Sequence, residues 1–216
     1  MTPLQAAAAL VAEIAALPRR DTASIRAVRQ ARTKAWARQP VDFILEVARA
    51  LAARHAGRWV GEELIRFHRP AFAAFDDTLA AELAQGLDSW DTVDAYARIL
   101  VGPAWARGQV SDGLIDTWSR SPDRWLRRAA LVSTVALNRP AEGGRIDAPR
   151  TLAICARLAG DRDDMVEKAV SWALRELGRQ DAAPVEAFLA DNIVGARVRR
   201  EVGNKLRTGL KNPKSD

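Results

Sequence analysis

Apolar side chains recur at every third or fourth position along almost the whole chain, which is the period of an amphipathic α-helix. Capping residues, glycine and proline interrupt the pattern, with Gly102-Pro103 ending or kinking one helix. Alternating β-branched stretches and Asn-Gly turns, which would indicate paired strands, do not occur. The sequence therefore predicts an all-α fold with helices at 3–17, 24–39, 41–54, 57–69, 78–87, 90–100, 111–120, 122–139, 147–160, 162–180, 183–192 and 195–209.

Three of these helices repeat one pattern. The segments DRWLRRAAL, DDMVEKAVS and ARVRREVGN combine charged, apolar, basic and small residues in a similar order. Aligned on Arg128, Lys168 and Arg200, they lie 40 and 32 residues apart, a spacing typical of helix-pair repeats. We therefore expect a HEAT-like repeat α-α superhelix, a curved solenoid of about six antiparallel helix pairs. Residues 1–216 are expected to form one domain, with divergent helices in 1–40 and a flexible tail at 210–216.

The charge balance points to a polyanionic partner. The net charge is +6, and 28 of the 33 basic residues are arginine. Arginine binds phosphate through paired hydrogen bonds, so this choice suits a protein that contacts a nucleic-acid backbone. GC-rich codon usage would also enrich arginine and alanine, and composition does not decide between the two. Any single basic residue can be explained as part of an ordinary solvated helix face. Basic residues that recur at the same position of repeated helices instead favour a cationic surface along one layer of helices.

Missing motifs exclude several kinds of chemistry. The sequence has no CxxC, HExxH or acid-rich calcium loop, and His55 and His68 stand apart from other metal ligands. It also lacks a P-loop, a GxGxxG and a GxSxG motif, and Gly143-Gly144 is a simple turn. We therefore expect neither a metal nor a cofactor.

Cysteine usage and the N-terminus indicate the compartment. The single cysteine, Cys155, lies in an apolar run and cannot form an internal disulfide, which fits a reducing environment. The apolar N-terminal segment has no basic start, contains Glu13 and is too short to span a bilayer. We interpret it as an amphipathic helix, expect no membrane partner, and expect a cytoplasmic, nucleoid-associated bacterial protein.

Tryptophan gives the remaining sign of a functional site. The chain has seven Trp and one Tyr. Each Trp alone has a structural explanation, because indoles pack in cores and an acid near a helix start suits the helix dipole. Two aromatic faces, a carboxylate and an arginine on one cationic surface suggest a site instead. The pairs at helical spacing are Trp90 with Asp94, Trp125 with Arg128, and Trp172 with Lys168 and Arg175.

Four segments resemble the signature segments of AlkD-like alkylpurine DNA glycosylases, a family of HEAT-like repeat DNA alkylation repair enzymes. The segments are SWDTVD (89–94), RWLRRAAL (124–131), KAVSWALRE (168–176) and RREV (199–202), in the family's order. The family's motif residues fall on Trp90, Asp94, Arg128 and Trp172. The basic segment SIRAVRQARTKAWA lacks the Gly–Val/Ile and Pro element usual in the family, so the accepted adduct stays open.

The resemblance implies a monofunctional glycosylase of base excision repair. It would hydrolyse the N-glycosidic bond of N3- or N7-alkylated purines, such as 3-methyladenine, 7-methylguanine or bulkier adducts, without a base-flipping pocket. Asp94 would stabilise the cationic sugar, Trp90 and Trp172 would offer it π-faces, and Arg128 would hold a phosphate. No lysine in or near these motifs is an obvious nucleophile, since Lys168 is assigned to phosphate binding, and this argues against lyase activity.

The expected partner is double-stranded DNA with alkylated purines, bound by a monomer. One alternative is a non-catalytic HEAT-repeat protein that binds damaged or branched DNA, although such a protein has no need of Asp94 against an anionic ligand. Another is a protein scaffold, which would carry an apolar or mixed-charge concave surface. For a DNA-binding protein we expect phosphate contacts from Arg128, Lys168, Arg175, Arg199 and Arg200 on one groove.

Overall fold

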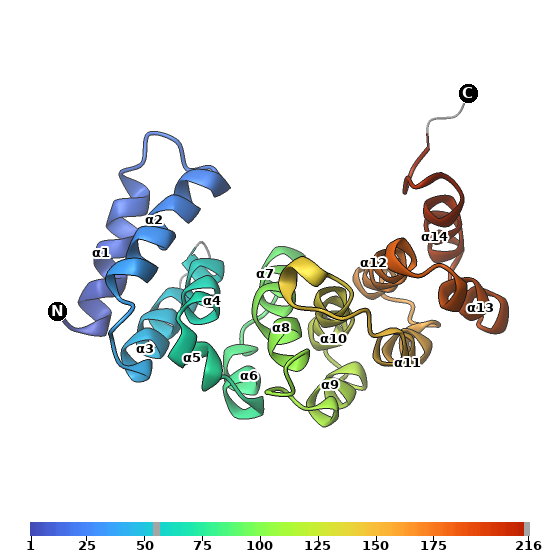
Figure 1. The fold of residues 1–216 in the computed structure, drawn as a ribbon, viewed down its shortest axis with the longest axis horizontal. Coiled ribbons are helices and arrows are strands. Elements are labelled where there is room, and N and C mark those ends of the chain that lie inside the picture. The colour runs from blue at the N-terminus through green and yellow to red at the C-terminus, as the bar shows by residue number, and fades with distance from the viewer. Residues whose placement is uncertain (54–56, 214–216) are drawn as a thin grey trace. The chain divides into compact units, whose positions relative to one another are not determined.

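The computed structural model describes residues 1–53 and 57–213, and every regular element in these ranges is a helix (Figure 1). The all-α prediction is therefore confirmed. Residue 54 of the expected third helix, His55, and residues 214–216 of the expected tail lie outside the described residues. None of the helices in the described ranges is both long and apolar enough to cross a membrane.

The chain divides into two compact units, Met1–Gln85 and Gly86–Asp216, called unit 1 and unit 2 below. Each unit has its own set of packed helices. The expectation of a single domain over the whole chain is not decided by this division and stays a prediction.

In unit 1, helix α3 packs against α1 and α4, and α2 packs against α4 (Figure 1). Aliphatic side chains that include Leu10, Ile44, Leu51 and Leu64 fill the core between these helices. The bounds are α1 (Pro3–Ala15), α2 (Thr22–Ala35), α3 (Val41–Ala52), α4 (Arg58–Phe67), α5 (Arg69–Ala73) and α6 (Asp77–Leu83).

The helix expected at 57–69 is interrupted at His68. This residue has an extended backbone (φ −89°, ψ 102°), so α4 ends before it and α5 begins after it. Its Nδ1 accepts a hydrogen bond from the N–H of Ala71 (3.2 Å), which satisfies one of the free donors at the start of α5. Pro70 lies in the first turn of α5, where its missing N–H does no harm. The prediction of one helix up to Pro70 was wrong, because a histidine cap leaves little trace in the sequence.

The helices of unit 2 form two layers (Figure 1). The first layer consists of α7 (Trp90–Tyr96), a π-helical segment (Ala97–Val101), α8 (Gly102–Trp105), α10 (Arg124–Leu137), α12 (Asp164–Gln180) and α14 (Ala196–Thr208). The second layer consists of α9 (Asp112–Ser119), α11 (Ala148–Leu158) and α13 (Ala183–Asp191), and a short 3-10 helix (Pro140–Glu142) follows α10. Stacked helix pairs of this kind are the α-helical repeat fold that the sequence predicted.

Burial supports the repeat offset between α12 and α14. Val166 and Val170 are fully buried in α12, and Val198 and Val202, 32 residues later, are fully buried in α14. The two helices therefore bury the same face. This is the periodicity that the aligned segments predicted.

A close approach between α8 and α10 depends on Gly102. The helix that begins at Trp90 does not end at Gly102-Pro103 but passes through the π-helical segment and continues to Trp105. A Cβ atom on Gly102 would lie 2.5 Å from the carbonyl oxygen of Ser133 and 2.7 Å from the Cβ of Ala136. Because neither neighbour is the end of a flexible side chain, only glycine fits at this contact.

We predict that Gly102→Ala destabilises the protein by about 1–3 kcal/mol, the usual effect of overpacking a close contact. Gly203, in the middle of α14, is the matched control, because no atom apart from the nearby backbone of its own helix lies within 4 Å of its Cβ position. Gly203→Ala should stabilise by up to about 1 kcal/mol through helix propensity. Urea unfolding followed by circular dichroism measures both changes, and equal effects would contradict the tight α8–α10 contact.

Candidate active site

The start of α7 presents the first two residues of the candidate site. Ser89 is the N-cap residue, and its hydroxyl lies 3.0 Å from the hydroxyl of Thr92. Trp90 occupies the first helical position and is 58% exposed. Asp94 follows four residues later, and residues with this spacing share one face of a helix. An exposed indole and a carboxylate therefore lie on the same face of α7.

Arg128 holds Asp94 in a two-point ion pair. Nε of Arg128 donates to Oδ1 of Asp94 (2.8 Å), and Nη2 donates to Oδ2 (2.7 Å). The third nitrogen, Nη1, donates to the backbone carbonyl of Met165. The Arg128 side chain is 6% exposed and that of Asp94 is 17% exposed. One guanidinium group thus joins α7, α10 and α12 and fixes the plane of the carboxylate.

Opposing effects act on the charge of Asp94. Burial raises the pKa of Asp94 above its ordinary value, while the hydrogen bonds and the charge of Arg128 lower it. The charge of Arg98 lowers this pKa as well, and Asp91 raises it. The negative charge on Asp94 therefore depends on Arg128, its principal stabilising partner.

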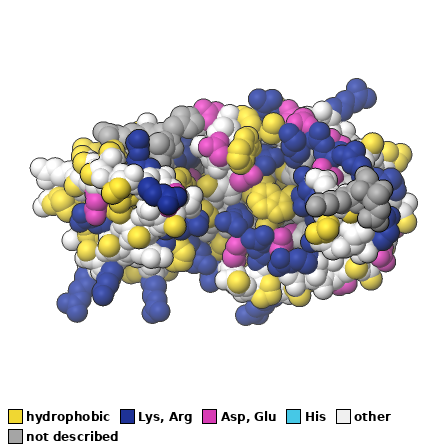
Figure 2. Space-filling view, turned by 90° about the horizontal axis from the view of Figure 1, so that it is seen from above, with side chains coloured by type: hydrophobic (Ala, Val, Ile, Leu, Met, Phe, Trp, Pro, Cys, Tyr) yellow, Lys and Arg dark blue, Asp and Glu magenta, His cyan; other side chains and the backbone are white. Residues whose placement is uncertain are grey.

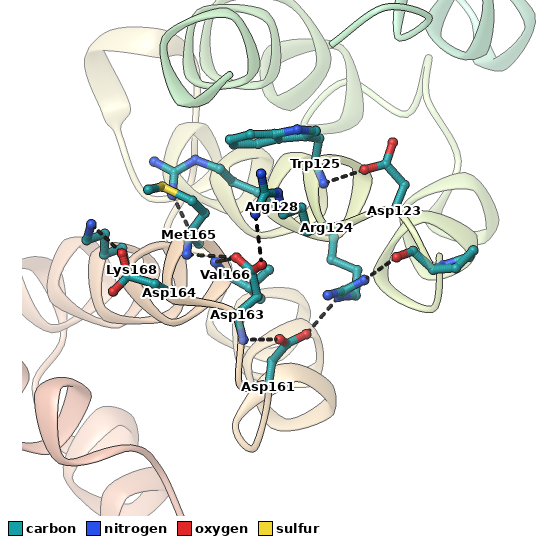
Figure 3. Close-up of polar contacts among 12 residues, drawn as sticks. Asp123, Arg124, Trp125, Arg128, Asp161, Asp163, Asp164, Met165, Val166 and Lys168 are labelled. Atoms are coloured by element: carbon teal, nitrogen blue, oxygen red, sulfur yellow. Dashed lines mark hydrogen bonds and ion pairs between the residues drawn. The ribbon is translucent and has the colours of Figure 1, made fainter. Parts of the chain in front are cut away.

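Polar contacts at the starts of α10 and α12 keep the Met165 carbonyl within reach of Arg128 (Figure 3). Asp163 is the N-cap of α12 and accepts hydrogen bonds from the backbone N–H of Met165 (2.8 Å) and of Val166 (3.4 Å). Arg124, the first residue of α10, donates to the same carboxylate (3.4 Å). The first turn of α12 is thereby tied to the first turn of α10.

These supporting contacts were not predicted from the sequence. A second ion pair between the same two regions joins Arg127 of α10 to Asp161, with Nε 2.7 Å from Oδ2. The two pairs are 39 and 34 residues apart, which is close to one repeat. A search for opposite charges one repeat apart would have found the basic residues of 124–128 and the acidic residues of 161–164.

Trp172 lies on α12, the helix that Arg128 contacts, and is half-buried. Arg175, three residues later, is also half-buried, and its Nε donates to the hydroxyl of Ser171 (3.2 Å). Burial lowers the pKa of Arg175 from its ordinary value. The structure therefore brings Asp94 and Arg128 into direct contact and carries Trp90 and Trp172 on helices of the same layer.

The other expected phosphate-binding cations are exposed. Lys168 forms a 2.6 Å ion pair with Asp164, one turn before it, and both side chains are about half exposed. Arg199 donates to two backbone carbonyls at the end of α13 (3.2 and 3.4 Å). Arg200 is exposed as well. In the right-hand part of Figure 2, which unit 2 occupies, many Lys and Arg side chains and some Asp and Glu side chains border an apolar patch.

Arg128 departs from the expected row of exposed cations. The repeat predicts the same environment for Arg128 as for Lys168, but Asp94 draws the arginine inward and buries it. The reason lies in a neighbouring helix, since Asp94 is 34 residues away in the sequence. Its guanidinium group contacts a carboxylate, and the expected phosphate contact stays a proposal.

The described residues include no group of three or more His, Cys, Asp or Glu side chains arranged to hold a metal ion. Cys155 is buried, and burial raises the pKa of its thiol strongly, so its thiolate is disfavoured. His68 caps α5 in unit 1. The candidate site thus comprises the ion pair of Asp94 and Arg128, with Trp90 on α7 and Trp172 on α12.

Comparisons with known proteins bear on the family and the fold of the chain. The sequence model of a family described as "DNA alkylation repair enzyme" matches residues 21–207. A solved structure, a predicted DNA alkylation repair enzyme from Enterococcus faecalis, is similar with a TM-score of 0.66 and 16% identity over 85% of this chain and 84% of that one. At this identity the likeness concerns the fold alone. No curated protein matches the chain significantly.

We predict that Arg128→Gln destabilises the protein by about 3–5 kcal/mol at neutral pH, because it leaves a buried carboxylate without its partner. Without Arg128 the folded-state pKa of Asp94 rises further, so the carboxyl becomes neutral as the pH falls. The loss of stability should therefore shrink as the pH is lowered toward about 4. Arg200→Gln, which removes an exposed cation, is the control. Equal unfolding free energies for the two variants from pH 4 to pH 8 would show that the ion pair does not stabilise the site.

Proposed function

The chain belongs to the DNA alkylation repair enzyme family, whose sequence model covers residues 21–207, and from this premise we propose that it is a monofunctional DNA glycosylase. The family is one of enzymes that act on alkylation damage in DNA. The proposed reaction is hydrolysis of the N-glycosidic bond of an N3- or N7-alkylated purine in duplex DNA, which leaves an abasic site. The observation that carries the proposal is a carboxylate held in fixed orientation on the same helical face as an exposed tryptophan.

The proposed chemistry suits these side chains. An alkylated purine is already cationic, so it leaves as a neutral base with the electron pair of the broken C1′–N bond. Positive charge then develops on the deoxyribose, and Asp94 stabilises that charge electrostatically. A water molecule adds to C1′ and loses one proton to Asp94 or to solvent. Removing a single preorganised electrostatic group of this kind typically slows a reaction by about 100- to 1000-fold.

The two tryptophans would act on the same cationic sugar. Trp90 is largely exposed and can place its ring against a ligand without rearrangement of the core. Trp172 is half-buried, so only part of its ring is available. A cation–π contact with each indole contributes about 1–2 kcal/mol when water is excluded. The tryptophans therefore add to the contribution of Asp94 and do not replace it.

Arg128 would act mainly as a positioning residue. Three of its five N–H groups are used by Asp94 and Met165, which leaves two for a further acceptor. A DNA phosphate that reaches one of these two N–H groups would make the proposed phosphate contact, and it would have to approach a side chain that is only 6% exposed. Asp94 keeps 17% of its side chain exposed, so it stays partly open to a ligand.

A non-catalytic protein that binds damaged or branched DNA is the second candidate. The observation that favours it is the ion pair itself, because a carboxylate that joins α7 to α10 can be retained for structure alone. The two candidates share the DNA-binding surface and differ in whether the glycosidic bond breaks.

We predict that the purified protein releases 7-methylguanine or 3-methyladenine from duplex DNA and that Asp94→Asn slows this release by about 100- to 1000-fold. Trp172→Ala should slow it as well. Asp91→Asn, an exposed carboxylate on the same helix, is the matched control. Single-turnover formation of abasic sites is the measurement. Full activity of Asp94→Asn would refute the assigned carboxylate, and binding without any release by the wild type would establish the non-catalytic candidate.

We also predict that affinity for undamaged duplex DNA is independent of sequence and falls steeply with salt, with a log–log slope of about −0.9 for each phosphate neutralised. Lys168→Gln and Arg200→Gln should each make this slope shallower by about 0.9. Arg120→Gln removes a cation at the end of α9, in the other layer of unit 2, and is the control. Fluorescence anisotropy at several salt concentrations measures the slopes, and an unchanged slope in both variants would remove these residues from the DNA-binding surface.

A further inference from the structure

Unit 1 contains a cavity that the proposed glycosylase site does not use. It has a volume of about 670 Å³ and lies between α2 and the junction of α4 and α5. Sites for small ligands commonly have volumes of about 300–1,000 Å³. The cavity is therefore large enough for a nucleotide-sized group.

The cavity has a positive lining. Arg29, Lys34 and Arg69 contribute cationic side chains, and no acidic residue is among its lining residues. Arg29 is 5% exposed, and its Nε donates to Glu63 (2.9 Å), a carboxylate that also accepts from Arg26 (2.8 Å). Two arginines thus share one negative charge, and a net positive charge remains beside the cavity.

Lys34 and Arg69 approach the cavity from different helices. Lys34 lies near the end of α2, and Arg69 is the first residue of α5. Both side chains are exposed, and neither forms an ion pair with any residue that the structure describes. Two such cations on either side of a cavity can hold a phosphate group between them.

An aromatic ring forms another wall of the cavity. Phe67 is 51% exposed at the end of α4, and the guanidinium of Arg29 lies 4.4 Å from the centroid of its ring. The arginine is itself fixed by Glu63, so the ring has a rigid support on that side. An exposed aromatic ring beside cations is the combination that binds unpaired nucleic-acid bases by stacking.

A buried donor also lines the cavity. His68 is 3% exposed, and its Nδ1 accepts the hydrogen bond that caps α5. The proton of the neutral ring is therefore on Nε2, and burial lowers the pKa of His68, which favours this neutral form. The backbone groups of Gln39 and Ala37 oppose the effect of burial and raise the pKa of the ring.

We propose that this cavity binds one unpaired nucleotide of a nucleic-acid strand, with its phosphate between Lys34 and Arg69 and its base stacked on Phe67. A base inside a duplex is already stacked on both sides, so Phe67 requires a nucleotide outside the helix. The proposal extends the function proposed above, since both concern DNA. Binding of a nucleotide here would give unit 1 a contact with DNA that does not involve Asp94.

Binding of a short, dye-labelled thymidine oligonucleotide to the full chain tests the proposal. Phe67→Leu keeps an apolar side chain but removes the π-face, and it should weaken single-strand binding by at least about fivefold. The same substitution should leave the affinity for an intact, blunt duplex within about twofold, since paired bases do not reach the ring. Arg69→Gln combined with Lys34→Gln should weaken oligonucleotide binding by about tenfold or more and reduce its dependence on salt. Arg19→Gln combined with Arg20→Gln, which removes two exposed cations outside the cavity, is the charge-matched control.

Unchanged oligonucleotide binding in Phe67→Leu, with a folded protein by circular dichroism, would overturn the stacking contact. Equal losses for single strand and duplex would also overturn it, because the site would then be part of a general phosphate surface. Saturating inorganic phosphate that competes as well as the oligonucleotide would identify a simple anion site and reject the nucleotide. All these measurements use undamaged DNA, so they stand whether or not the protein releases alkylated bases.

Discussion

The structure of the candidate site depends on one ion pair, between Arg128 and Asp94. A carboxylate that is largely removed from water tends to take up a proton, and burial raises the pKa of Asp94 in this way. The two hydrogen bonds from Arg128 oppose that effect and hold both oxygens in one plane. A fixed negative charge in a partly dry site is what a developing sugar cation requires. Without Arg128, the same carboxyl group would be more easily neutralised and free to rotate.

The repeat architecture supplies the support for this pair. Arg128 reaches α7 on one side and the first turn of α12 on the other, so its position depends on how three helices pack. Gly102 permits the close contact between α8 and α10, and Asp163 ties the start of α12 to Arg124. In a helical repeat each helix pair contacts only its neighbours, so the pair of Arg128 and Asp94 depends chiefly on the adjacent helices.

Much of this arrangement could be predicted from the sequence because helical period, caps and repeat spacing are local signals. The helices, their class and the one-repeat offset between α12 and α14 followed from those signals. The break at His68 did not, since an extended residue in an otherwise periodic segment is set by a side-chain cap. The burial of Arg128 was also missed, because a local pattern cannot show that a partner 34 residues away will draw the side chain inward. The cavity beside Phe67 depends on how α2 packs near α5, which periodicity does not encode.

The proposed role of Arg128, to position Asp94 for catalysis, is tested most directly by a double-mutant cycle on base release. Single-turnover rates for 7-methylguanine release are compared in the wild type, Asp94→Asn, Arg128→Gln and the double variant, after circular dichroism has shown that each is folded. If the two residues act as one unit, the double variant will be as slow as Asp94→Asn alone, within about twofold. If the two losses multiply instead, Arg128 acts independently of Asp94, which would contradict its role as the positioning residue of the carboxylate.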